Sequence, residues 1–266
     1  MDIVPKPKKS LGQHFLINTK ALEAIAKSLA IPEGSTIIEI GPGHGELTDI
    51  LIASPATTVV AIEKDHELAN ALRAKYASLS PKLEIIEGDA LTELARIAER
   101  IRTPYVLAGN IPYYITGHLL RIVGELPEKP LRTILTIQKE VALRICAAPP
   151  GMNRLSACVQ AWGEPRLAMT LSPTDFNPSP TIDSAIIAIE TKDEESRRAI
   201  PNNYYETVRV LFQQPRKTIL NNLAHGLTLE KNDALNLLKK AGLSGTERPE
   251  NLTVKTIGEI AWLSTH

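Results

Sequence analysis

Cysteine is scarce in this chain, and long apolar runs are missing. The 266 residues include two cysteines, Cys146 and Cys158, which do not stand at the Cys-x-x-Cys spacing of zinc and redox sites. This scarcity excludes a disulfide framework and favours a reducing compartment, the cytoplasm. No stretch of about 18 apolar residues occurs, and the N-terminal MDIVPKPKKS holds no apolar signal core. We therefore expect neither a membrane span nor export.

The sequence also lacks a metal-binding pattern and a net charge. His14 and His44 have no second histidine or cysteine at ligand spacing, so we expect no bound metal. The 30 lysines and arginines balance the 30 aspartates and glutamates. A neutral chain has no global field that attracts nucleic acid, so local basic patches would have to bind such a partner. With 43% hydrophobic and 23% charged residues, the composition is that of a globular protein with a sizeable core.

The apolar residues that are present form alternating strand and helix patterns. Short apolar runs predict strands at 35–40, 57–63, 83–88, 104–110 and 132–138. Helical spacing predicts helices at 18–30, from the glycine loop to about 53, and at 65–78, 93–100 and 139–147. Strands that alternate with helices predict an α/β fold with a parallel sheet covered on both faces. Such sheets bind ligands at the carboxyl ends of their strands.

The character of the chain changes towards its C-terminus. LAMTLSP (167–173) and SAIIAIE (184–190) predict two closing strands, separated by a proline-rich loop. Helical segments follow at 203–213, 216–226, 231–242 and 253–263. We therefore expect a main domain, residues 1–192, and a small helical C-terminal domain, residues 193–266.

The first predicted strand runs into a glycine loop, IIEIGPGHGE, that is typical of a cofactor site. Glycines let the backbone approach a ligand closely and turn its N–H groups inward. The dinucleotide fingerprint fails, because its sixth place needs a small residue and holds Glu46. The spacing of Glu39, Gly41, Gly43 and Gly45 instead resembles the first motif of S-adenosylmethionine (AdoMet)-dependent methyltransferases.

Two acids at the ends of the next strands favour the same cofactor. Glu63 ends the second strand, about 20 residues downstream, where a carboxylate accepts from both ribose hydroxyls. Asp89 ends the third strand and is placed to accept from the adenine amino group. Either acid alone could be a helix cap. The glycine loop, Glu63 and Asp89, however, stand at the ends of three successive strands. We therefore predict AdoMet as the cofactor, bound by a Rossmann-like class I methyltransferase domain.

GNIPYYIT (109–116), at the end of the fourth strand, indicates which group is methylated. The lone pair of a base amine is delocalised into the ring, and acceptors aimed at its N–H groups localise it in the transition state. The side-chain oxygen of Asn110 and the carbonyl of Ile111 are such acceptors. Pro112 stiffens the turn, and the ring of Tyr113 offers a face to an extruded base. The loop resembles the Asn/Asp-Pro-Pro-Tyr motif, which serves amines of adenine, cytosine or glutamine.

Seven stretches together resemble one family over nearly the whole chain, from about residue 8 to 265. In order they are KSLGQHFL, EIGPGHGELT, EGDAL, GNIPYYITG, QKEVALRI, FNPSPTIDSA and RKTILNNL. They are similar to the small-subunit ribosomal RNA adenine N6,N6-dimethyltransferases, the kasugamycin-sensitivity family. The resemblance implies dimethylation of two adjacent adenosines in a hairpin loop near the 3′ end of 16S RNA, within the 30S subunit. We expect a monomeric enzyme with a role in 30S biogenesis.

The resemblance also implies roles for individual residues. Catalysis would involve Asn110, Ile111, Tyr113 and Phe176, with Phe176 stacking on the target adenine opposite Tyr113. Cofactor contacts would come from His14, Leu16, Gly41, Gly43, Glu63, Asp89 and Asn110, with Gln13 as a further candidate. The chain departs from the usual family pattern at His14, where asparagine is common, and at Pro215, where arginine is common.

Because this chain has no net charge, local groups of basic residues would have to bind the RNA. The bases of double-stranded RNA are hidden in a deep major groove, so a loop base splayed into a pocket suits the predicted chemistry. RNA contacts are expected from Lys8, Lys9, Arg144, Arg216 and Lys217.

Two alternative functions stay open at this stage. One is dimethylation of large-subunit RNA, as in the related macrolide-resistance enzymes. The other is a 30S assembly checkpoint in which binding matters more than methylation. The basic N-terminal arm and the helical C-terminal segments motivate the second alternative.

Overall fold

The computed structural model describes residues 5–79 and 81–265, which form two compact units. The first unit comprises the chain up to Ala142 and Pro165–Thr191; the second comprises Leu143–Glu164 and the chain from Lys192 onward. The chain passes from the first unit to the second after Thr191, next to the predicted domain boundary at residue 192. Residues 143–164, which we expected in the first domain, belong to the second unit instead.

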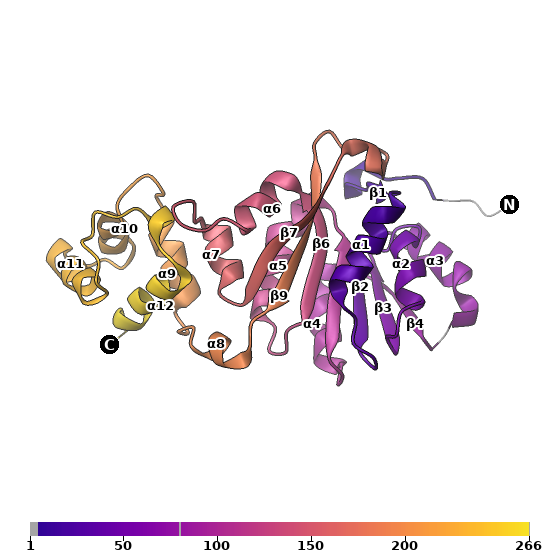
Figure 1. The fold of residues 1–266 in the computed structure, drawn as a ribbon, viewed down its shortest axis with the longest axis horizontal. Coiled ribbons are helices and arrows are strands. Elements are labelled where there is room, and N and C mark those ends of the chain that lie inside the picture. The colour runs from indigo at the N-terminus through magenta and orange to yellow at the C-terminus, as the bar shows by residue number, and fades with distance from the viewer. Residues whose placement is uncertain (1–4, 80, 266) are drawn as a thin grey trace. The chain divides into compact units, whose positions relative to one another are not determined.

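A seven-stranded sheet with the order β4-β3-β2-β5-β6-β9-β7 forms the centre of the first unit (Figure 1). Its strands are β2 (Thr36–Ile40), β3 (Thr58–Glu63), β4 (Leu83–Glu87), β5 (Tyr105–Asn110), β6 (Arg132–Gln138), β7 (Gly163–Leu171) and β9 (Ser184–Thr191). Strands β2 to β6 pair in parallel, and β9 pairs antiparallel with β6. The predicted α/β methyltransferase-type fold is thereby confirmed.

The register of the parallel strands aligns their carboxyl ends. Ile40 of β2 lies opposite Ile62 of β3 on one side and Gly109 of β5 on the other. Gly109 is needed there, because a Cβ at this position would lie 2.6 Å from the carbonyl oxygen of Ile40. The residues that follow β2, β3, β4 and β5 therefore meet at one edge of the sheet.

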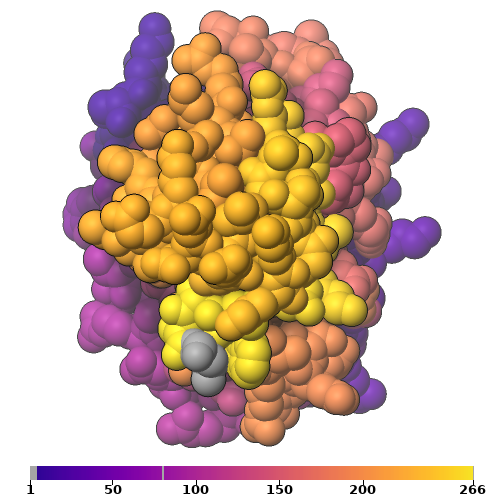
Figure 2. Space-filling view, turned by 90° about the vertical axis from the view of Figure 1, so that its left-hand side faces the viewer, coloured from indigo at the N-terminus to yellow at the C-terminus, as the bar shows by residue number. Residues whose placement is uncertain are grey.

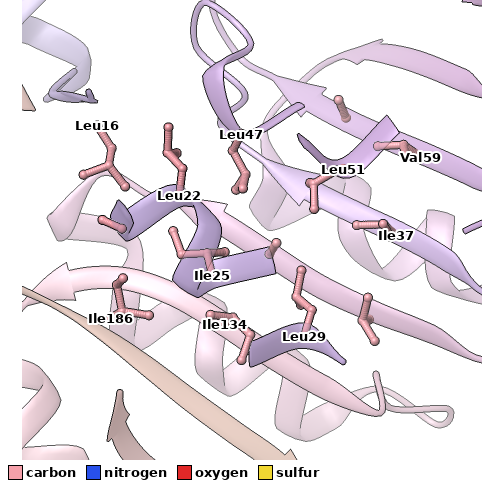
Figure 3. Close-up of a cluster of buried hydrophobic side chains, with 14 of the residues drawn as sticks. Leu16, Leu22, Ile25, Leu29, Ile37, Leu47, Leu51, Val59, Ile134 and Ile186 are labelled. Atoms are coloured by element: carbon pink, nitrogen blue, oxygen red, sulfur yellow. The ribbon is translucent and has the colours of Figure 1, made fainter. Parts of the chain in front are cut away.

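Helices cover both faces of this sheet (Figure 1). They are α1 (Thr19–Leu29), α2 (Glu46–Ile52), α3 (His66–Lys75), α4 (Ala90–Arg100) and α5 (Thr116–Glu125). Helix α6 (Lys139–Ile145) follows β6 and contains the division between the two units after Ala142. Asn18 caps α1, accepting from the N–H of Ala21 at 3.2 Å. Leu22, Ile25 and Leu29 of α1 recur at helical spacing and are buried in a cluster shared with α2 and α3 (Figure 3).

Two short strands attach the N-terminal arm (residues 5–14) to the segment before β9. Strand β1 (Phe15–Leu16) pairs antiparallel with β8 (Phe176–Asn177). Short 3₁₀ helices complete the described chain at Lys9–Leu11, Ala77–Leu79, Tyr113–Ile115, Pro173–Asp175 and Pro249–Asn251.

The second unit is helical and has its own core. Its helices are α7 (Arg154–Gln160), α8 (Glu194–Arg198), α9 (Tyr204–Leu211), α10 (Ile219–Gly226), α11 (Lys231–Lys240) and α12 (Val254–Leu263), shown from orange to yellow in Figure 2 except α7. Tyr204 is fully buried, and its hydroxyl donates to the carbonyl of Ala157 at 3.1 Å. This contact joins α7 to α9, and Met152, Ala157 and Ala161 are buried in the core of this unit, which agrees with the place of residues 143–164 in it. Within the described residues, no helix is long and apolar enough to cross a membrane.

Glu39 is a buried carboxyl in the second-last position of β2. The residue is 1% exposed, and its Oε2 accepts a hydrogen bond from the Thr48 hydroxyl at 2.7 Å. Burial raises the pKa of Glu39 to about 8, and the hydrogen bond from Thr48 opposes this rise only in part. The folded protein therefore holds a proton on Glu39 at neutral pH.

Replacing Gly226 by alanine should destabilise the second unit by about 1–3 kcal/mol, because the added Cβ overpacks a full core. That Cβ would lie 2.5 Å from Cγ1 of Val210, which is 1% exposed. The matched control is Gly258→Ala in α12, whose Cβ would meet Pro201 at an ordinary 3.7 Å. The control should be neutral or more stable, by about 0.5–1 kcal/mol. Urea unfolding measures both, and equal effects would contradict the prediction.

Replacing Glu39 by glutamine should remove a pH dependence of stability. A folded pKa of about 8 lies above the usual value of 4.5, so the folded state binds the proton more tightly than the unfolded state. This contribution is complete below the unfolded pKa and is lost as pH rises through the folded pKa. Thermal melts should show that the stability of Glu39→Gln, relative to that of the wild type, rises between about pH 5 and pH 8. A constant difference across that range would mean that Glu39 does not titrate there.

Candidate active site

A pocket opens at the edge where the strand ends meet, with an empty volume of about 770 Å³ that includes open solvent. Its wall consists of residues 11–15, 40, 41, 43, 62–64, 68, 88–90 and 110–115. Eight predicted site residues lie in this wall: His14, Gly41, Gly43, Glu63, Asp89, Asn110, Ile111 and Tyr113. Gln13 lies there as well. Residues up to 99 positions apart in the sequence, from His14 to Tyr113, are thus brought together.

The glycine loop after β2 has a backbone that side chains would disturb. Gly41 and Gly43 have φ of +67° and +63°, in the left-handed region. A Cβ on Gly43 would lie 2.7 Å from the ring of Phe15, and one on Gly41 would lie 3.3 Å from the carbonyl oxygen of Asn110. The glycines therefore allow the loop to approach both β5 and β1.

Glu63 is held by backbone donors at the end of β3. Its Oε1 accepts from the N–H of Asp65 at 2.8 Å, and its Oε2 accepts from the N–H of Gly43 at 3.3 Å. Burial raises the pKa of Glu63, while these N–H groups oppose the rise. A carboxylate offers about four lone-pair positions, so two remain for a ligand.

Asp89 caps α4 and forms an ion pair at the other end of the pocket. Its Oδ1 accepts from the N–H of Leu91 at 2.9 Å, and its Oδ2 lies 2.7 Å from Nζ of Lys64. Burial alone would raise the pKa of Asp89, but the bonds from Lys64 and Leu91 lower it overall. Asp89 is therefore a charged acceptor.

The side-chain amide of Asn110 has a defined orientation. Its Nδ2 donates to the carbonyl oxygen of His14 at 2.7 Å. The donor end therefore points to the arm, and Oδ1 is left as an acceptor. Ile111, the next residue, is 3% exposed and is fixed by the core below the loop.

Tyr113 stands beside this amide. Its hydroxyl lies 2.6 Å from Oγ of Ser184, at the start of β9, which holds the ring in place. The ring of His14 is nearly parallel to it, with an interplanar angle of 18° and centroids 6.2 Å apart. Burial raises the pKa of Tyr113, so its hydroxyl stays protonated at neutral pH. Tyr114 is 63% exposed at the mouth of the pocket.

Two predicted site residues do not lie in the pocket wall. Leu16 and Phe176 are partners in the β1–β8 pair and are 2% and 3% exposed, within the core of the first unit. Stacking of Phe176 on a target base stays a prediction, and it requires the ring to leave this core. The motif around Phe176 does reach the arm, because the carbonyl of Pro178 accepts from Nδ1 of His14 at 2.7 Å.

Sequence reasoning missed two residues that hold the site together. Lys64 pairs with Asp89, and Ser184 fixes Tyr113. Lys64 directly follows Glu63 at a strand end, which is a weak positional signal. Ser184 carries no signal of its own, because its contact depends on where β9 lies beside β6.

The residues expected to bind RNA fall into two groups. Lys9, Arg144, Arg216 and Lys217 are exposed and form no ion pair within residues 5–79 and 81–265. Lys8 instead pairs with Asp65 at 2.7 Å inside the first unit. Their contacts with RNA stay predictions. Among the described residues, no three or more His, Cys, Asp or Glu side chains are grouped so that they could hold a metal ion.

The pocket fits the predicted cofactor. A ribose presents two hydroxyl donors, and Glu63 has two lone-pair positions left for them. Asp89 can accept from an adenine amino group, and Ile40 and Ile62 give the wall apolar surface. The acceptor Oδ1 of Asn110 and the ring of Tyr113 lie on the other side of the pocket, where a second, planar substrate can be held.

Comparison with known proteins identifies the family of the chain. The family model for ribosomal RNA adenine dimethylase matches residues 4–261. A ribosomal RNA small subunit methyltransferase A of Dehalococcoides mccartyi is 36% identical over 94% of this chain and 86% of its own length. The protein of that name from a Synechococcus species is 34% identical over 92% of this chain and 90% of its own.

Two solved structures share the fold. A dimethyladenosine transferase from Plasmodium falciparum superposes with a TM-score of 0.79 at 24% identity, covering 93% of this chain and 96% of that one. The 23S rRNA methyltransferase ErmE superposes with a TM-score of 0.71 at 24% identity, covering 95% and 100%. The family predicted from the seven motifs is confirmed by the family model and the relatives: the chain belongs to the ribosomal RNA adenine dimethylase family.

Proposed function

We propose that this protein uses AdoMet to dimethylate N6 of two adjacent adenosines in the 3′-terminal hairpin loop of 16S RNA, within the 30S subunit. The relatives at 34–36% identity are named as small-subunit enzymes, which supports this substrate. The observation that carries the proposal is the orientation of Asn110, whose Nδ2 is bound by His14 so that Oδ1 can accept from an amine. The proposed enzyme acts as a monomer in the cytoplasm, where ribosomal subunits are assembled.

In the proposed reaction, the protein localises the lone pair of the target amine. In the first methyl transfer, Oδ1 of Asn110 and the carbonyl of Ile111 accept from the two N–H groups of N6, which favours the pyramidal geometry of attack. When bound, AdoMet would supply an electrophilic methyl group, and its sulfonium would become a neutral thioether. No strong base is needed, because the alkylated amine loses its proton readily.

The same loop would hold the extruded base. Tyr113 offers a ring on which the adenine stacks, a contact worth about 1–3 kcal/mol. The hydroxyl of Tyr113 is tied to Ser184, so the ring is preorganised before the base arrives. On the other side of the pocket, Glu63 and Asp89 would hold the ribose and adenine of the cofactor.

Incubation of the protein with labelled AdoMet and 30S particles that lack the mark should yield N6-dimethyladenosine at two adjacent positions. Mass mapping of the modified RNA identifies the nucleotides. A known homologue is the positive control. Labelling of 50S particles instead would favour the large-subunit alternative, and absence of product on 30S particles would refute the proposal.

Asn110→Ala should lower the rate of methyl transfer by about a hundredfold, because one transition-state acceptor is lost. Affinity for 30S particles should stay near that of the wild type, since Asn110 lies in the wall of the pocket rather than among the exposed cations. If the variant methylates normally, the proposed role of Asn110 is wrong. If it is inactive yet fully restores subunit maturation in cells, the assembly checkpoint carries the biology.

The double variant Arg216→Met/Lys217→Met should weaken binding to 30S particles and flatten its salt dependence. Each lost phosphate contact reduces the slope of log K against log salt by about 0.7–0.9. The matched control is Lys239→Met/Lys240→Met, which removes the same charge from exposed residues at the end of α11. Equal slopes for both double variants would mean that Arg216 and Lys217 make no specific RNA contact.

A further inference from the structure

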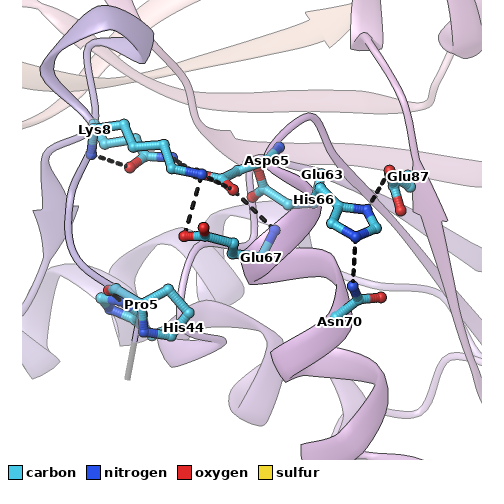
Figure 4. Close-up of polar contacts among 10 residues, drawn as sticks. Pro5, Lys8, His44, Glu63, Asp65, His66, Glu67, Asn70 and Glu87 are labelled. Carbon is cyan, nitrogen blue, oxygen red and sulfur yellow. Dashed lines mark hydrogen bonds and ion pairs between the residues drawn. The ribbon is translucent and has the colours of Figure 1, made fainter. Parts of the chain in front are cut away.

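The N-terminal arm closes on itself and binds one buried carboxylate. The backbone N–H of Lys8 donates to Oε1 of Gln13 at 2.7 Å, which closes a loop around the 3₁₀ turn Lys9–Leu11. Nζ of Lys8 then reaches Oδ1 of Asp65 at 2.7 Å, and Nε2 of Gln13 reaches Oδ2 at 3.1 Å (Figure 4). We call Lys8, Gln13 and Asp65 the arm contact.

Asp65 is buried, and its charge depends on compensation by Lys8. Its side chain is 1% exposed, whereas that of Lys8 is 38% exposed. Burial alone would raise the pKa of Asp65, and the bonds from Lys8 and Gln13 lower it overall, so the group is charged in the fold. Removing the lysine would leave a buried charge without its cation, which is costly. Glu67 adds only a longer contact to Lys8, at 3.3 Å, from an exposed position.

The arm contact connects both sides of the pocket. The N–H of Asp65 donates to Oε1 of Glu63, the acid expected to hold the ribose. One residue beyond Gln13, the carbonyl of His14 accepts from Nδ2 of Asn110. The carbonyl of His14 is thus placed by the arm, and the arm is held down by Asp65.

We propose that Lys8 is a positioning residue: with Asp65 it fixes the arm, so that the carbonyl of His14 orients the amide of Asn110 for catalysis. Lys8 thereby acts inside the protein rather than as an RNA contact. Its effect on catalysis rests on the proposed function, whereas its effect on the arm does not. Without the arm contact, the carbonyl of His14 loses one of its supports, while the bond from its ring to Pro178 and the β1–β8 pair remain. The amide of Asn110 is then held less firmly and can turn its donor end towards the substrate.

Hydrogen exchange tests the arm directly, without substrate. In Lys8→Met, the amides of residues 8–17 should exchange about tenfold faster, as expected for loss of a hydrogen bond to a charged group. Lys6→Met is the matched control, because Lys6 lies in the same arm and forms no ion pair within the described residues. In Lys6→Met, the amides of residues 8–17 should exchange at the rates of the wild type. Unchanged exchange in Lys8→Met would overturn the proposal.

Kinetics test the connection to Asn110. At saturating AdoMet and varied concentrations of 30S particles, Lys8→Met should lower kcat about tenfold with KM for the particles unchanged, and Lys8→Arg should retain most of the rate. The double variant Lys8→Met/Asp65→Asn should be no slower than Lys8→Met, because both changes remove one contact. A structural role alone would lower the melting temperature without this split.

The outcomes separate the two proposals. If the wild type does not methylate 30S particles, the proposed function fails while the exchange result still decides the arm contact. If the wild type is active and Lys8→Met keeps its kcat but raises KM for 30S particles, Lys8 is an RNA contact and the positioning role is refuted.

Discussion

The hydrogen bond from the amide of Asn110 to the carbonyl of His14 connects the two halves of the pocket. An amide side chain has one donor end and one acceptor end, and fixing either determines the other. The arm supplies the fixed acceptor, and β5 supplies the amide. The glycines at 41, 43 and 109 let β2 and its glycine loop lie close to β5 and β1, since a Cβ at any of them would meet a neighbour within 3.3 Å.

Four acidic side chains lie near the same edge of the sheet, and each is stabilised in a different way against the cost of desolvation. Glu39 is neutralised by a proton, as its raised pKa indicates. Glu63 is held by two backbone N–H groups, and Asp65 by a lysine and a glutamine. Asp89 is only partly buried and is paired with Lys64. Among these four, Glu63 and Asp89 lie in the pocket wall, where a ligand can use their remaining lone pairs.

The sheet and the pocket could be predicted because their signals are local. Strands β2 to β6 are runs of β-branched and apolar residues, and parallel pairing brings the motifs at their ends together. Helix α5 was missed because Gly117 and Gly124 weaken its propensity and the GNIPYYIT loop (109–116) masks its start. The burial of Phe176 and the pairing of Lys8 with Asp65, 57 positions away, depend on tertiary contacts that no local pattern encodes.

The pairing of β1 with β8 has a consequence for how the enzyme is made. Leu16 needs Phe176 as its partner, and His14 needs the carbonyl of Pro178, 164 positions later. During translation the arm is synthesised first, yet its partners leave the ribosome only after most of the sheet. The arm of the nascent chain therefore stays without these two anchors until late in synthesis, and a chain truncated before residue 176 lacks both of them.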